Sequence, residues 1–162
     1  PYTSRPIRFG EQEGVEYYFT TEEQVAQLEH LGKIIELRAY DTIHGIWKYF
    51  TVDDAQIHLE QSSYLLIGTL ESYLKIRDYF GEKDLVPIYI KVDDGLRLQR
   101  ALDRERKQEV PKYTELCRRF LADDEDFSDA KLAAAGIRKQ FENKDLKSTV
   151  AAITTYILEM NR

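Results

Sequence analysis

The stretch "SRPIRFGEQEGVEYYF", Ser4–Phe19, decides how the rest of the sequence is interpreted. Its two arginines, Arg5 and Arg8, flank Pro6, whose ring fixes one backbone angle and biases its neighbour toward extended geometry. A stiff backbone that holds two guanidinium groups suits a phosphate dianion, which arginine binds through two parallel hydrogen bonds. Tyr17 adds a hydroxyl donor. The alternative is a turn with two solvated arginines, because exposed arginines are common.

The composition limits the classes of protein to which the chain can belong. Its 162 residues suit one domain, or a core with a small inserted lobe, and 43% of them are apolar, as in a folded protein. The net charge of −6 lacks the basic footprint of a nucleic-acid binder, although a local cationic pocket for a small anion remains compatible with it. The sequence contains no run of about 18 apolar residues, so no membrane span is predicted.

The few cysteines and histidines suggest neither a metal site nor a thiol nucleophile. Cys117 is the single cysteine, which fits a reducing compartment, and a cytoplasmic location is expected. Its position on an apolar helical stripe predicts that it lies in the core. The three histidines and this cysteine show no metal-ligand spacing, so no protein-bound metal is expected.

Short apolar runs alternate with helical patterns, which predicts an α/β domain built on a parallel sheet. Pro87 is unfavourable in a central strand, and Pro111 suits the first position of a helix. A capping box at 20–23 opens the first helix, which Gly32 ends. The predicted strands are 33–40, 47–52, 64–67, 85–92 and 137–143. The further predicted helices are 70–80, 93–107, one that begins at Pro111 and one that begins at Asp145.

Glu36 is a candidate base-binding residue. The strand around it alternates, with Ile34, Glu36 and Arg38 on one face and Ile35, Leu37 and Ala39 on the other. Guanine presents two adjacent N–H donors, and one carboxylate can accept both. A solvent-facing strand glutamate is the equally weighted alternative.

Two further groups are candidates. Thr69 follows the apolar run at 64–67, and ligands of open α/β sheets bind beyond the carboxyl ends of strands; its hydroxyl also suits a helix N-cap. Arginines at helical spacing could close over a polyphosphate, as phosphoryl transfer requires, or form a solvated face paired with neighbouring acids. Arg97, Arg100 and Arg104 have this spacing, Arg106 lies just beyond them, and Arg118 and Arg119 follow after a short break.

The order of these signals resembles the guanylate kinase family. Its signature, R-x-P-R or a variant followed by G-E-x-x-G-x-[DE]-Y-x-F, is similar to residues 5–19, with the proline one place earlier here. The segments "GKIIEL", "HGIWKYF", "RALDRER", "CRRFL" and "FENKDL" resemble that family's later segments in the same order. The resemblance covers essentially the whole chain. It implies a P-loop kinase-like three-layer α/β fold with a parallel sheet, helices on both faces, a β-rich GMP-binding lobe and a helical lid.

The resemblance also implies a division of labour within one domain. The lobe would span about 3–60, the core about 62–96 and 136–162, and the lid with its following helix about 97–122. GMP and ATP would be the ligands, with Mg²⁺ accompanying ATP. The implied GMP-binding residues are Arg5, Arg8, Tyr17, Glu36, Tyr49 and Thr69; the implied lid cations are Arg104, Arg106 and Arg119; and Asn143 is implied near the adenine.

Several features depart from the family pattern. Thr69 replaces the usual aspartate, the aromatic segment reads Trp47-Lys48-Tyr49, and Pro1 stands where a serine is usual. No G-x-x-x-x-G-K-[ST] loop, which cradles the ATP phosphates, occurs in the sequence. We expect an N-terminal strand, loop and helix to be missing from these residues, and the chain without them to be inactive.

Three functions therefore stay open. The first is a phosphotransferase that converts ATP and GMP to ADP and GDP when a P-loop is present. The second is a non-catalytic guanylate-kinase-like module that binds a nucleotide or a phosphorylated peptide. The third is a related kinase with a different nucleoside monophosphate as acceptor. The oligomeric state is not predicted.

Overall fold

The computed structural model describes residues 1–42 and 45–160, and the chain forms two compact units, Pro1–Leu85 and Val86–Arg162. The predicted lobe lies within the first unit and the predicted lid within the second. The predicted core segments are divided between the two units. His44, in the predicted glycine–aromatic segment, lies outside the described residues.

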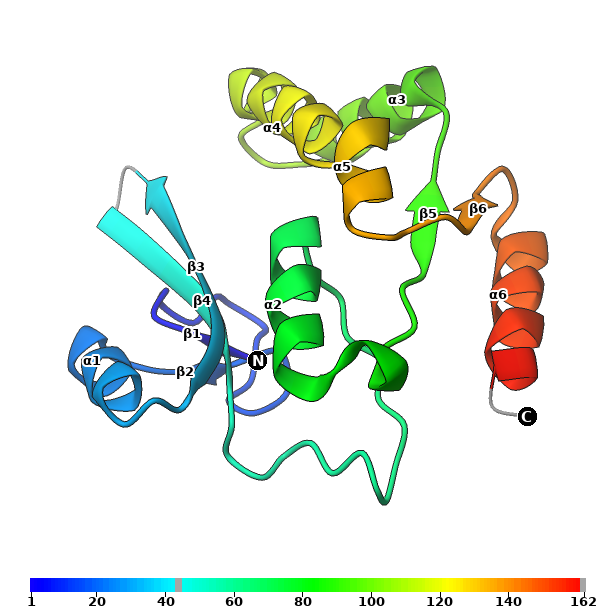
Figure 1. Ribbon diagram of the computed structural model, residues 1–162. Helices are drawn as coiled ribbons and strands as arrows, with labels where there is room; N and C mark the ends of the chain where they lie inside the picture. Colours follow the sequence, from blue (N-terminus) through cyan, green and yellow to red (C-terminus); the bar gives the residue numbers. More distant parts are fainter. Residues whose placement is uncertain (43–44, 161–162) are drawn as a thin grey trace. The chain divides into compact units, whose positions relative to one another are not determined.

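The first unit is built on a four-stranded mixed sheet with the order β2-β1-β4-β3 (Figure 1). The two short strands, β1 (Tyr2–Thr3) and β2 (Tyr18–Phe19), run parallel, and the long hairpin of β3 (Ile34–Thr42) and β4 (Gly45–Val52) is antiparallel. β1 pairs with β4 and joins the two halves of the sheet. The Ser4–Phe19 stretch therefore leaves the sheet at β1 and returns to it at β2.

One face of this sheet forms the core of the unit. Leu37, Phe50, Tyr2 and Tyr18 are aligned across the four strands, and Tyr2 stacks between the other two rings. Val25 of α1 (Glu22–His30) is fully buried in the same cluster. Thr21 and Gln24 form the capping box of α1, one residue later than predicted.

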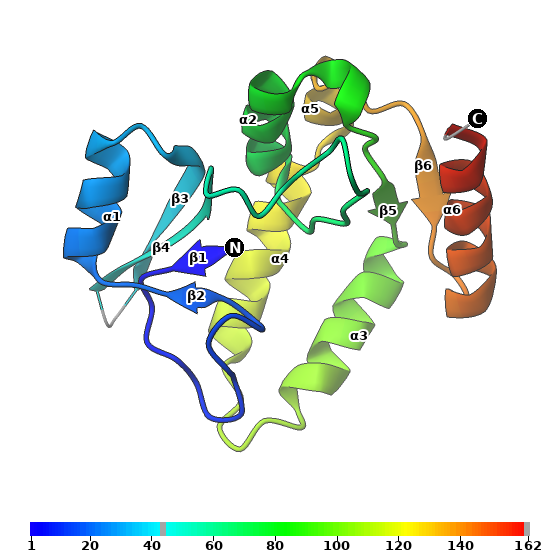
Figure 2. The same cartoon turned by 90° about the horizontal axis from the view of Figure 1, so that it is seen from below.

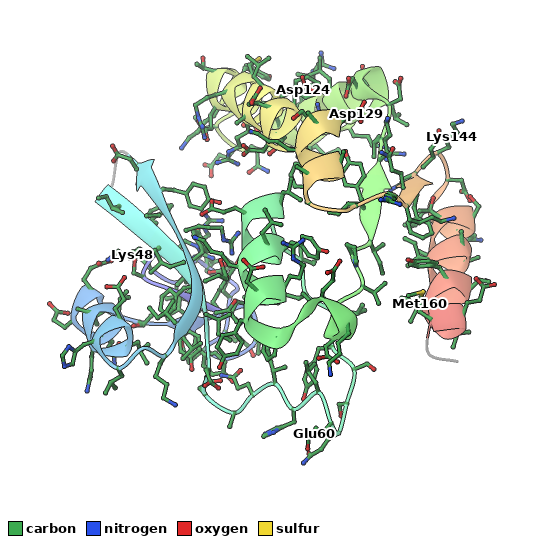
Figure 3. The ribbon with its side chains drawn as sticks, viewed as in Figure 1. Lys48, Glu60, Asp124, Asp129, Lys144 and Met160 are labelled. Carbon is green, nitrogen blue, oxygen red and sulfur yellow. The ribbon has the colours of Figure 1, made fainter. Side chains whose placement is uncertain are left out.

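Lys48 lies on the same side of the sheet as α1. Its ammonium group is 2.7 Å from the Glu22 carboxylate at the N-terminus of that helix, and Figure 3 labels Lys48 beside α1. The hydrogen bond from Lys48 lowers the pKa of Glu22. This ion pair holds α1 against one face of the sheet. The opposite face carries the polar side chains of the candidate site described below.

The first unit ends with α2 (Leu70–Phe80) and a 3-10 turn at Glu82–Asp84. α2 has the predicted bounds, and Thr69 is its N-cap, as expected: its hydroxyl accepts from the Ser72 N–H at 3.3 Å. Lys75 of α2 donates to the Leu37 carbonyl of β3, which ties the helix to the sheet.

The predicted strand at 64–67 is wrong. These residues have no strand geometry, and Leu65 and Ile67 are 87% and 99% exposed. A buried parallel strand needs hydrogen-bonding neighbours on its edges, and no strand among the described residues pairs with this segment. Apolar composition alone therefore did not determine its conformation.

The second unit contains a two-stranded parallel sheet of β5 (Tyr89–Lys91) and β6 (Gln140–Glu142). Both strands are shorter than predicted. Pro87 has no N–H to donate, so the pairing of β5 begins after it. Four helices complete the described part of the unit (Figure 2): α3 (Asp94–Glu105), α4 (Tyr113–Asp126), α5 (Asp129–Ala134), which was not predicted, and α6 (Leu146–Met160).

Two sequence predictions about α4 need correction. Its N-cap is Lys112, so the helix begins after Pro111 and not at it. Cys117 is exposed, not in the core, because α4 is covered along a narrow line only: Phe120 packs under the Arg97 guanidinium, 4.0 Å from the ring centre, while Leu121 is 67% exposed. Among the described helices, none has the length and apolar character needed to cross a membrane.

Candidate functional site

Arg5 is the most enclosed charged side chain of the Ser4–Phe19 stretch. It is only 3% exposed, so the alternative of a solvated arginine is wrong for this residue. Its Nη1 and Nη2 atoms donate to the two oxygens of Glu11 at 2.8 and 2.6 Å, and Nη1 also donates to the Pro6 carbonyl. The Arg8 backbone N–H donates to the same carboxylate at 2.8 Å. Glu11 therefore fixes the guanidinium and closes the loop that carries both arginines.

The electrostatics of this pair follow from its geometry. The hydrogen bond from Arg5, with that from the Arg8 backbone, lowers the pKa of Glu11 to about 2. The same bond to Glu11 raises the pKa of Arg5, and a hydrogen bond to Tyr49 adds to this rise. The pair is therefore ionised at every physiological pH.

Aromatic rings surround the Arg5 guanidinium. Its central carbon lies 5.3 Å from the ring centre of Tyr17 and 5.5 Å from that of Phe19, which are cation–π distances. The Tyr17 ring in turn meets Tyr49 edge to face at 5.7 Å. The structure thus brings together three of the predicted GMP-binding residues, Arg5, Tyr17 and Tyr49. We call these three with Glu11 and Phe19 the Arg5 cluster.

The Arg5 cluster continues along the face of the sheet opposite α1. Arg38, Tyr49, Thr3 and Phe19 are aligned across β3, β4, β1 and β2, one position away from the core row. Successive strands lie about 4.8 Å apart, so Arg38 and Thr3 are about 10 Å apart along this row. This is the length scale of a nucleoside monophosphate.

Glu36 lies on this face, two residues before Arg38, and is 3% exposed. Its Oε1 accepts from the Thr51 hydroxyl at 2.8 Å, and its Oε2 accepts from the Arg38 Nε at 3.0 Å. A solvent-facing glutamate is therefore wrong here. The prediction that Ile34 shares a face with Glu36 is also wrong, because a β-bulge between the two residues turns Ile34 toward the core.

The remaining predicted residues of the first unit have different surroundings. Arg8 is exposed, and the structure gives its backbone a role, in the bond to Glu11. Thr69 caps α2, and its hydroxyl lies 3.4 Å from that of Ser72. Neither side chain is part of the Arg5 cluster, and their proposed contacts with a ligand stay predictions.

The predicted lid cations lie in the second unit and are exposed. Arg106 lies 3.7 Å from Asp103, and Arg119 and Arg118 both pair with Glu115 at 2.7 Å. Bonds from these two arginines lower the pKa of Glu115 to about 2. Arg104 is exposed near the end of α3. These exposed pairs match the alternative of a solvated helical face, and a contact of the arginines with a polyphosphate stays a prediction.

Asn143 directly follows β6, and its N–H donates to the Lys91 carbonyl at the end of β5. Both parallel strands end here, where α/β sheets commonly bind ligands. A shallow cavity of about 280 Å³ occupies the position, lined by Lys91, Asp93, Leu96, Glu142, Asn143 and Lys144.

The described residues contain no cluster of metal-ligating side chains. In residues 1–42 and 45–160, no group of three or more His, Cys, Asp or Glu side chains is arranged to hold a metal ion. The Ser or Thr of a Gly-Lys-Ser/Thr loop, which helps to hold Mg²⁺ in P-loop kinases, is absent from the sequence. Binding of Mg²⁺ together with ATP therefore stays a prediction.

The fold can be compared with known proteins. No model of a known protein family and no curated protein sequence matches the chain. Among solved structures, it is similar to the guanylate kinase from Anaplasma phagocytophilum, with 21% sequence identity, a TM-score of 0.57, and coverage of 98% of this chain and 72% of that one. The chain therefore has a guanylate kinase-like α/β fold, which confirms the predicted fold class.

Sequence reasoning missed three residues of the site: Glu11 in the loop between β1 and β2, and Thr51 and Arg38 on the sheet face opposite α1, which we call the site face. Glu11 lies at the glutamate of the G-E-x-x-G part of the signature, to which no role was assigned. Arg38 shares the face of Glu36, as the alternation predicted, and Thr51 lies opposite Glu36 in the hairpin register. Predicting Thr51 required knowing where the hairpin turns.

Proposed function

We propose that Pro1–Leu85 carries the GMP-binding site of a guanylate kinase-like phosphotransferase, which moves the γ-phosphoryl group of ATP to GMP when a P-loop is also present. The observation that supports this most strongly is the shared face of one sheet, with a buried arginine at one end and a buried carboxylate at the other.

In this proposal the Arg5 cluster binds the GMP phosphate. Nη1 and Nη2 of Arg5 face Glu11, so the bond to that carboxylate orients the guanidinium before a ligand arrives. Exposed Arg8 and the Tyr17 and Tyr49 hydroxyls supply further donors. A preoriented site loses little side-chain entropy on binding, which favours affinity.

Glu36 binds the guanine base in the same proposal. A carboxylate has about four acceptor positions, and the bonds from Thr51 and Arg38 use two of them. Two positions remain for the N1–H and the exocyclic amine of guanine. Thr69 contacts the base from the N-terminus of α2, and Arg104, Arg106 and Arg119 act on the transferring phosphoryl group, with Asn143 near the adenine.

Calorimetric titration of the 162-residue chain with GMP and AMP tests the acceptor site. We expect GMP to bind and AMP to bind more weakly, because adenine lacks the N1–H that Glu36 accepts. Binding of AMP tighter than GMP would remove the role given to Glu36 and favour a different acceptor. A coupled assay on the same chain should detect no ADP above background, since no P-loop sequence is present.

The second candidate is a non-catalytic module that binds a nucleotide or a phosphorylated peptide. Pairing of Arg106, Arg118 and Arg119 with carboxylates of their own helices favours it, because those cations are not held ready for a polyphosphate. A chain extended by a P-loop separates the two candidates. Production of ADP on addition of GMP and ATP supports the kinase, and GMP binding without turnover supports the module.

A further inference from the structure

We propose that Arg38 is a second base-binding residue, which donates to the O6 atom of guanine beside Glu36 and so selects guanine over adenine. The inference rests on the proposed GMP site and assigns it a specificity residue.

Arg38 lies beside Glu36 on the sheet face opposite α1. It follows Glu36 by two residues on β3, so both side chains lie on the site face, and it is directly opposite Tyr49. Its side chain is 19% exposed, while that of Glu36 is 2% exposed. The guanidinium therefore lies at the boundary between the buried carboxylate and the open side of the sheet.

Most N–H donors of Arg38 are available to a ligand. Its Nε bonds Glu36 at 3.0 Å, which fixes the plane of the guanidinium. Among the described residues, neither Nη1 nor Nη2 has a hydrogen-bond or ion-pair partner. Arginine has five N–H donors, so four remain for a ligand or solvent after the bond to Glu36. They lie next to the carboxylate on which the guanine N–H groups would bind.

Guanine matches this arrangement of one acceptor group and one donor group. Its O6 acceptor adjoins the N1–H donor and is followed by the exocyclic amine, so Arg38 and Glu36 can contact three consecutive groups. Arginine to guanine O6 and N7 is a common base-specific contact. Adenine has an amine in place of O6 and an acceptor at N1, so it opposes a donor with a donor and an acceptor with an acceptor. The pair can thus discriminate by repulsion as well as by attraction.

The opposite role for Arg38 is a plug that guanine must displace from Glu36. The acceptor count argues against it, because Arg38 and Thr51 leave two positions of the carboxylate available. The two roles predict opposite effects of removing the arginine, so the same experiment separates them.

Calorimetry of the Arg38→Met variant with GMP, IMP and AMP is the test. IMP keeps O6 and N1–H but lacks the exocyclic amine. We expect the affinities for GMP and IMP to fall by the same factor, roughly 5- to 150-fold, the range for one bidentate base contact. The weak affinity for AMP should not fall. Arg38→Lys should restore part of the loss, because lysine still donates to O6.

Unchanged or increased GMP affinity in Arg38→Met would overturn the inference, and an increase would identify Arg38 as a plug. Equal losses for GMP and AMP would also overturn it, since they indicate a structural role. Glu36→Gln is the matched control and should reduce GMP binding more than IMP binding. If the wild-type chain does not bind GMP, the proposed function itself fails; if it binds and Arg38→Met binds equally well, only the role of Arg38 fails.

Discussion

Two arginine–carboxylate groups in this chain have the same local chemistry and opposite surroundings. Arg5 binds Glu11 in the first unit, and Arg118 and Arg119 bind Glu115 in the second, and in both cases the carboxyl pKa is lowered to about 2. Arg5 is 3% exposed, whereas the side chains of Arg118 and Arg119 are 63% and 71% exposed. Equal pKa values therefore do not indicate equal structural roles.

The difference lies in how many other contacts fix each arginine. Arg5 has Glu11, the Pro6 carbonyl and two aromatic rings around it, so contacts on several sides restrict its guanidinium. Arg118 and Arg119 share one carboxylate on the surface of their own helix, and such pairs contribute little to stability. The first arrangement suits a preformed anion site. The second suits cations that change partners when a ligand arrives.

The largest effect should come from removing the buried carboxylate of the site face. Glu36→Ala leaves Arg38 and Thr51 without their shared partner and should lower the free energy of unfolding by about 3 kcal/mol, the scale for breaking a buried charged pair. Urea denaturation measures it. Glu115→Ala, which removes an equally paired but more exposed carboxylate, is the control. Equal midpoints for the two variants would contradict the comparison.

A smaller effect should follow from removing one hydrogen bond to Glu36. Thr51→Val keeps the shape and the strand propensity but leaves a buried carboxylate oxygen without its donor, at a cost of about 1–3 kcal/mol. The control is Thr154→Val, the same change at an exposed position of α6. Thermal unfolding should show a lower Tm for the Thr51→Val variant only. A similar Tm for both variants would show that the Thr51–Glu36 hydrogen bond does not stabilise the fold.

The smallest effect concerns salt. The depressed pKa of Glu11 means that its contribution to stability is complete above its ordinary pKa of 4.5 and is lost as the pH falls toward about 2. The pKa of Glu115 is also lowered, so its contribution to stability is likewise lost as the pH falls. At 1 M salt, where the screening length is about 3 Å, NMR titration should find the pKa of Glu115 closer to its ordinary value and that of Glu11 still near 2. Equal shifts would show that both pairs are screened alike.

The sequence predicted best where local chemistry determines the structure. α2 and its Thr69 cap follow from helical spacing and a hydroxyl before the first turn. The burial of Arg5 could not be predicted, because it depends on Glu11 and Tyr17 of a loop and Phe19 of β2 meeting around the guanidinium. The bulge at β3 moved Ile34 to the other face, and alternation carries no signal for it.

Apolar composition was the least reliable guide. The run at 64–67 was predicted to be a buried strand, but burial there depends on strand neighbours that the described chain does not supply. Cys117 was assigned to the core from the same kind of pattern, and α4 covers only part of that stripe. Pattern indicates which residues can be buried, and the surroundings decide which of them are.

The most direct test of the central claim is GMP binding to three variants of the 162-residue chain, Arg5→Ala, Arg8→Ala and Arg119→Ala, measured by calorimetry. Loss of a hydrogen bond to a charged group costs about 1.5–3 kcal/mol, so the first two variants should bind GMP at least tenfold more weakly. Arg119→Ala should bind as the wild type does, since its residue lies outside the acceptor site. Unchanged GMP affinity in both Arg5→Ala and Arg8→Ala would contradict the account.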